Sequence, residues 1–136
     1  VAYNVLDRRM EERVFPLARQ QDVGIVVRSA LLKGALTDRA DSLPPHLDAL
    51  RVAAHAFRAL AADLPGRPTA VQAALRFCLA HPAISATLIG VRDMAELEEA
   101  VAVASAPAIP LDALAALRAL SVPDERLLDP GTWGIP

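Results

Sequence analysis

Residues 24–31 read GIVVRSAL and decide the fold class. Ile25 to Val27 form a β-branched run without polar alternation, which is typical of a strand buried on both faces of a parallel sheet. Arg28 and Ser29 follow at the end where parallel barrel strands carry their functional groups. The stretch therefore predicts a buried parallel strand with polar side chains at its C-terminal end.

The rest of the sequence alternates between strand-like and helix-like segments. Two further strands are expected, at residues 1–6 (VAYNVL) and 85–89 (SATLI). Apolar spacing predicts helices over 10–21 (interrupted at Pro16), 46–64, 70–80, 93–104 and 114–120, a loop over 31–45 and an extended tail over 127–136. Thr69 with Gln72 and Asp93 with Glu96 have the spacing of helix N-caps. Strands that alternate with helices indicate parallel βαβ units.

The number of strands argues against a complete small fold. Three parallel strands leave two edges unpaired, and a stable domain normally covers such edges. A complete (β/α)₈ barrel needs eight strands and roughly 250 residues, whereas this chain has 136 residues. We therefore expect an α/β fold that is the C-terminal portion of a TIM barrel, about three βα units plus extra helices. Residues 1–136 would be the C-terminal part of a single domain whose N-terminal part is missing.

Composition and charge exclude several classes of protein. Hydrophobic residues make up 54% and the net charge is −2, which argues against a disordered chain and a nucleic-acid partner. Cys78 is the only cysteine, and His46, His55 and His81 have no metal-ligand spacing, so we expect no metal. No run of about 18 apolar residues predicts a membrane span, and the first residues lack the basic start and apolar core of a signal peptide. We expect a cytoplasmic protein.

Two strand ends carry candidate binding residues. Gly90 and Arg92 lie between a strand and a capped helix, where free backbone amides and a guanidinium suit an anion; an ordinary turn with a solvated arginine is the alternative. Arg28 can lay its guanidinium plane over an aromatic ring, or simply reach water. Lys33 is the only lysine and so the only Schiff-base candidate.

The order and spacing of these motifs closely resemble the C-terminal part of aldo/keto reductases. The resemblance rests on YNVLDRR, EERVFPLARQQDVGIVVRSALLKGALT and AVQAALRFCLAHPAISATLIGVRDMAELEEAV, and runs from residue 1 to about residue 103. Residues 3–8, 24–29 and 85–90 resemble the sixth, seventh and eighth barrel strands of that family.

The resemblance implies a cofactor site made of Arg28, Ser29, Ala30, Leu31, Lys33, Gly90, Arg92, Glu96 and Glu99. Arg28 would stack on the nicotinamide, and the stretch 29–31 would wrap the pyrophosphate, with Lys33 close to the same phosphates. Gly90 and Arg92 would meet the adenosine 2′-phosphate. Glu99 would contact the adenine. Glu96 stands where Gln or Arg is usual, and an acid is unfavourable beside a 2′-phosphate. The implied cofactor is NADP(H), with NAD(H) as the alternative.

The implied activity is reduction of an aldehyde or ketone to an alcohol by hydride transfer. The family's catalytic Asp, Tyr, Lys and His lie on earlier strands and loops, so the chain would supply part of the cofactor site and no catalytic residue. The first alternative is a regulatory protein that keeps the fold and cofactor without turnover. The second is an unrelated interaction module with an exposed apolar patch. The carbonyl substrate and the oligomeric state are not encoded in these motifs.

Overall fold

The β-branched run forms a strand in the computed structural model of the chain, which describes residues 1–135. Strand β1 (Ile25–Val27) pairs in parallel with β2 (Ile84–Thr87), and the register shifts between Ile25 and Val26. Gly24 precedes this irregularity, and a Cβ atom there would lie 3.2 Å from the Ser85 hydroxyl oxygen. That hydroxyl accepts a hydrogen bond from the Ile25 amide at 3.1 Å. The missing side chain therefore allows β2 to approach the start of β1.

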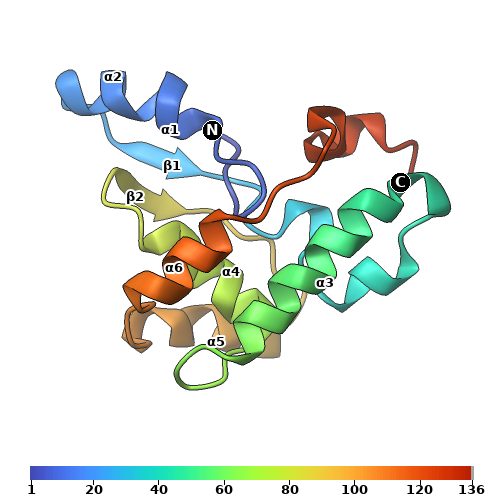
Figure 1. The fold of residues 1–136 in the computed structure, drawn as a ribbon. Coiled ribbons are helices and arrows are strands. Elements are labelled where there is room, and N and C mark those ends of the chain that lie inside the picture. The colour runs from blue at the N-terminus through green and yellow to red at the C-terminus, as the bar shows by residue number, and fades with distance from the viewer. Residues whose placement is uncertain (136) are drawn as a thin grey trace.

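The described residues also form six α-helices. They are α1 (Met10–Arg13), α2 (Phe15–Gln20), α3 (Asp48–Ala62), α4 (Ala70–Leu79), α5 (Met94–Ala102) and α6 (Leu111–Arg118). Helix α4 lies in the centre and contacts β2, α3 and α5, while α3 also contacts α6 (Figure 1). The capping box that the sequence predicts is present: the Thr69 hydroxyl accepts from the Gln72 amide, and the Gln72 side chain accepts from the Thr69 amide. The N-cap at Asp93 is also confirmed, because its carboxylate oxygen accepts a hydrogen bond from the Glu96 amide at 2.9 Å.

The core lies between these helices and one face of the sheet. Tyr3, Phe57 and Phe77 are its largest fully buried side chains. The Tyr3 ring stacks on Phe77 with 6.0 Å between the ring centroids and contacts Phe15 at 5.3 Å. These rings join the N-terminal segment to α2 and α4, so residues far apart in sequence share one core.

The expected first strand is wrong in most of its length. Residues 1–6 make only an isolated parallel bridge, from Ala2 to Arg28. The buried Asn4 side chain accepts hydrogen bonds from the amides of Leu6 and Asp7 at 3.0 and 2.9 Å. A side chain that bonds its own backbone offers a turn in place of a strand. The chain consequently bends away from β1 after Tyr3.

The N-terminal turn is also tied to the last helix. The Tyr3 hydroxyl donates to Glu11 at 2.6 Å, and Arg118 of α6 forms an ion pair with the same carboxylate. The Arg8 guanidinium donates to the carbonyls of Arg118 and Leu120 at the end of α6. Cations and donors at a helix C-terminus satisfy carbonyls that have no intrahelical partner. Helix α6 is thereby held against the start of the chain.

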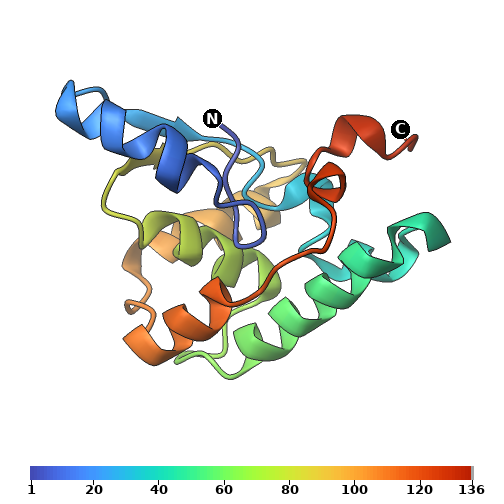
Figure 2. The ribbon, with the colours of Figure 1, turned by 45° about the horizontal axis from the view of Figure 1, so that its top comes forward.

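Other expectations need smaller corrections. The helix expected over 10–21 is two helices that break at Val14, because Pro16 starts the second one at its first turn. The sheet is covered on one face only, so Val26 is 45% exposed instead of buried on both sides. The tail expected to be extended contains two 3₁₀ turns, Glu125–Leu128 and Pro130–Thr132. Figure 2 shows this segment turning back beside the loop that follows β1.

Candidate functional site

A groove opens where both strands end. β1 leads into residues 28–39 and β2 into residues 88–92, and these loops meet because parallel strands place their carboxyl ends at one edge. The groove has a volume of about 880 Å³, and α5 and residues 129–131 complete its wall. All nine residues that the sequence singles out line it: Arg28, Ser29, Ala30, Leu31, Lys33, Gly90, Arg92, Glu96 and Glu99. The structure thus brings together two motifs about 60 residues apart.

The loop after β1 has an unusual backbone. Ser29, Leu32 and Lys33 have positive φ angles of 63°, 46° and 53°, although none of them is glycine. Left-handed backbone at non-glycine residues is strained and is concentrated at ligand-binding sites. The amides of Ser29, Ala30 and Leu31 donate no hydrogen bond to any atom of residues 1–135. These amides are therefore available to an anion such as a phosphate.

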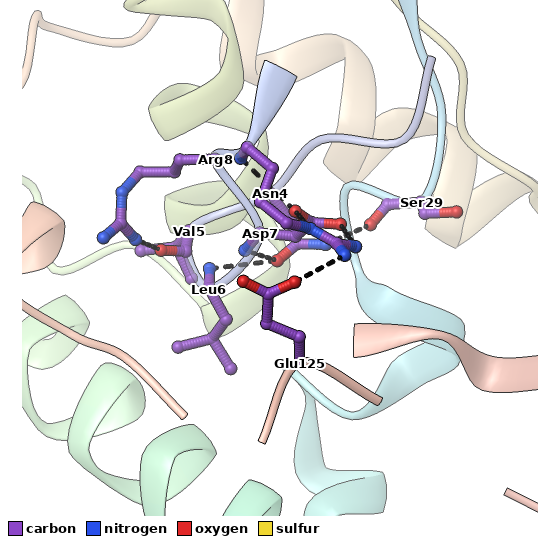
Figure 3. A network of polar contacts seen from close by, with 8 residues as sticks. Asn4, Val5, Leu6, Asp7, Arg8, Ser29 and Glu125 are labelled. Atoms are coloured by element: carbon purple, nitrogen blue, oxygen red, sulfur yellow. Dashed lines mark hydrogen bonds and ion pairs between the residues drawn. The ribbon is translucent and has the colours of Figure 1, made fainter. Parts of the chain in front are cut away.

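A buried asparagine holds this loop from behind. The Asn4 amide nitrogen donates to the Ser29 carbonyl at 3.1 Å, while its oxygen accepts from the N-terminal turn (Figure 3). Asn4 is 1% exposed, so no water competes for these bonds. Nearby, the Arg9 guanidinium binds both carboxylate oxygens of the buried Asp7, at 2.8 and 2.9 Å. The sequence predicts a strand over residues 1–6 and does not predict this positioning role of Asn4.

The C-terminal segment forms a third side of the groove. The Lys33 ammonium donates to the Ile135 carbonyl at 2.9 Å. Trp133 is buried, its indole donates to the Leu127 carbonyl at 3.0 Å, and His46 bonds the Trp133 carbonyl at 2.9 Å. This anchored tryptophan places residues 129–131 at the groove wall. Sequence alone left open whether Trp133 packs or covers the site, since its partners are distant in the chain.

The α5 side of the groove contains a tight ion pair. The Arg92 backbone amide donates to one Glu96 carboxylate oxygen at 2.7 Å, and its Nε donates to the other at 2.9 Å. Hydrogen bonds from Arg92, with a smaller contribution from the charge of Arg39, lower the pKa of Glu96. Glu99 accepts from the Thr69 hydroxyl at 2.5 Å. Glu96 therefore stays ionised beside Arg92.

Arg39 is a groove residue that the sequence analysis missed. It lies in a segment expected to be an irregular loop, which instead contains the 3₁₀ turn Asp38–Ser42. A Cβ atom on Gly34, which has a φ of 88°, would lie 2.8 Å from Arg39 Cδ. Gly34 therefore lets Arg39 fold back towards the groove. In the sequence, only the nearby Lys33 and Gly34 indicate a role for Arg39, because a lone arginine in a loop belongs to no periodic pattern.

The other candidate residues serve structural roles. His55 pairs with Asp41 at 3.0 Å. Burial lowers the pKa of His81, whose Nδ1 accepts a hydrogen bond from the Ala83 amide. Cys78 is fully buried, and burial raises the pKa of its thiol to about 12. Among residues 1–135, no three His, Cys, Asp or Glu side chains cluster as metal ligands.

Comparison with known proteins identifies the family. The model of the aldo/keto reductase family matches residues 1–121. The chain therefore belongs to the aldo/keto reductase family. No curated protein matches the sequence. Across residues 1–135, no helix is both long and apolar enough to cross a membrane.

Solved structures show the same relationship and its extent. The chain is similar to the holo form of the aldo-keto reductase AKR11C1 from Bacillus halodurans, with 25% identity and a TM-score of 0.68 over 88% of this chain and 42% of that one. The apo form of the same protein gives 25% identity and a TM-score of 0.67, over 88% and 41%. The chain thus spans about two fifths of these relatives. Its α/β fold is similar to part of a TIM-barrel reductase, with two strands and one bridge where three strands were expected.

Proposed function

We propose that the full-length protein is a nicotinamide-dependent oxidoreductase that reduces an aldehyde or ketone to an alcohol. The observation that carries the proposal is the assembly of all nine predicted residues around one groove at the ends of two parallel strands. In this proposal the chain supplies the part of the groove that binds the phosphates and the adenosine. The substrate is a small carbonyl compound or the corresponding alcohol.

The residues present fit a dinucleotide. Unpartnered amides of the left-handed loop and the Lys33 ammonium suit the pyrophosphate, since both present positive charge to an anion. Arg28 is exposed at the end of β1, where its planar guanidinium can stack on a ring. Arg92 and Glu96 lie beyond the end of the neighbouring strand β2 and would face the adenosine ribose.

When bound, a reduced nicotinamide supplies the hydride for the carbonyl carbon. The residues of this chain bind and orient it: Ser29 to Lys33 hold the phosphates, and Arg28 fixes the plane of the reactive ring. Such positioning converts an encounter between reactants into a step within one complex. We propose that the proton comes from the catalytic residues that the family carries on earlier strands, and no residue here is assigned that role.

Measurements of turnover and of dinucleotide binding distinguish an enzyme from a regulatory protein of the same fold. The full-length protein should consume NADPH or NADH in the presence of a panel of aldehydes and ketones. Lys33→Ala should weaken dinucleotide binding about ten-fold, the expected effect of one lost charge-assisted contact. Arg51→Ala, on the outer face of α3 and paired with Asp48, is the control. Binding without turnover would favour the regulator, and failure to bind either dinucleotide would refute both.

A further inference from the structure

Arg39 is the cation of the groove lining whose charged group has no partner within residues 1–135. Each of the other three donates a side-chain hydrogen bond to a partner in the chain, and these are Arg28, Lys33 and Arg92. Among the described residues, the Arg39 guanidinium makes neither an ion pair nor a hydrogen bond, although its backbone amide donates to the Thr37 hydroxyl. A free guanidinium can bind two oxygens of one phosphate. Arg39 is therefore open to an anion that enters the groove.

Acidic residues flank Arg39 in the sequence, and they would compete with such an anion. Asp38 precedes it, and Asp41 follows two residues later. Arginine pairs with an acid at a separation of two residues elsewhere in the chain, in Arg9–Asp7 at 2.8 Å and Arg126–Asp124 at 2.7 Å. A carboxylate bound to Arg39 in this way would take the donors that phosphate oxygens need. The cation stays free only where both acids are held elsewhere.

Helix α3 holds both acids. Arg58 Nη2 lies 3.3 Å from Asp38 Oδ1, and Arg58 Nη1 lies 3.2 Å from Asp41 Oδ1. His55, one turn earlier on α3, has its Nε2 3.0 Å from the same Asp41 oxygen. Because the two Nη atoms of Arg58 take different carboxylates, one side chain spans the Asp38–Ser42 turn, which packs against α3. In the part of the chain that the structure describes, no other cation pairs with Asp38.

We propose that Arg58, together with His55, is a positioning residue that keeps Arg39 free for the phosphates that NADH and NADPH share. The proposal rests on the proposed dinucleotide function and deepens it. Neither Arg58 nor His55 lines the groove, so both act through the acids that they hold and not by contact with the ligand. Gly34 leaves the space in which the Arg39 side chain folds back. The groove thus gains an unpaired cation because a helix outside it removes the competing carboxylates.

Titration of the full-length protein with NADH and with NADPH tests this proposal. Arg58→Gln keeps an aliphatic stem on α3 but removes the charge that holds Asp38 and Asp41. It should weaken binding of both dinucleotides about five-fold, the upper end of the effect of an exposed ion pair. Arg51→Gln is the matched control, since it removes a cation from the same helix that pairs with Asp48. It should change either affinity by less than about two-fold.

Two backgrounds separate this role from general support of the turn. In the double variant D38N/D41N no carboxylate is left to compete, and in Arg39→Ala no guanidinium is left to be captured. Adding Arg58→Gln should therefore change the affinity by less than about two-fold in either background.

Three results would overturn the proposal while the dinucleotide function stands. They are a five-fold loss from Arg58→Gln that persists in either background, wild-type binding by Arg39→Ala or Arg58→Gln, and a loss confined to one of the two dinucleotides. The first would mean that Arg58 acts through the fold of the turn or through its own charge. If correctly folded wild-type protein binds neither NADH nor NADPH, the proposed function itself is overturned.

Discussion

Replacing Asn4 tests how the N-terminal turn supports the groove. Its side chain makes three hydrogen bonds: it accepts from the amides of Leu6 and Asp7 and donates to the Ser29 carbonyl. Asn4→Ala removes all three and leaves two buried backbone donors without an acceptor. Asn4→Asp keeps the two acceptor bonds but replaces the donor with an oxygen that faces the Ser29 carbonyl.

The two variants should differ in their effects on the free energy of unfolding and on dinucleotide binding. An unsatisfied buried donor costs about 1–3 kcal/mol, so Asn4→Ala should lower the free energy of unfolding by about 2–4 kcal/mol after local relaxation. Asn4→Asp keeps the hydrogen bonds of the turn, but it should also lower stability, because it buries a carboxylate opposite the Ser29 carbonyl. It should still weaken dinucleotide binding, because the left-handed backbone at Ser29 loses its tether.

Denaturant unfolding and nucleotide titration of the full-length protein measure the two effects. Val5→Ala is the control: Val5 is fully buried in the same turn and makes no side-chain bond to the loop. It should lower stability and leave binding intact. The reasoning is refuted if Asn4→Ala costs less than about 1 kcal/mol, or if Val5→Ala weakens binding as much as Asn4→Asp does.

Two further predictions concern Arg28 and His81. Arg28→Ala should weaken NADH and NADPH binding by about 0.5–2 kcal/mol, the range for a planar cation on a ring; fluorescence titration should rank Trp above Lys as a replacement, and the opposite order would mean that Arg28 acts as a point charge. The pKa of His81 is below that of a free histidine, mainly because burial disfavours its charged form, although Glu11 opposes the shift. Stability should therefore be fully present above about pH 6.5 and fall as the pH drops through the lower folded pKa. His81→Asn keeps an acceptor for the Ala83 amide. In this variant the free energy of unfolding, measured in urea, should decrease less between about pH 7 and 5 than in the wild type. An unchanged decrease would mean that other groups cause it.

Features that depend on a few neighbouring residues were predictable from the sequence. Thr69 and Asp93 cap helices with side chains that reach only three residues ahead, and both caps are present. The β-branched run at Ile25 forms a strand because crowding at Cβ favours extended backbone. The nine residues that the family resemblance singles out line one groove, and their binding of a cofactor stays a prediction.

Features that depend on distant partners were decided by the tertiary structure. Residues 1–6 have the composition of a strand, but the Asn4 side chain bonds Leu6, Asp7 and Ser29 and turns the chain instead. Sequence alone establishes which residues prefer strand, helix and turn, because those preferences arise within a few residues. It does not establish that Lys33 meets the carbonyl of Ile135, or that Arg39 and Glu96 line the same groove. Those contacts join loops whose paths are fixed only when the core around Tyr3 and the anchored Trp133 has packed, and so the walls of the groove are a property of the folded chain.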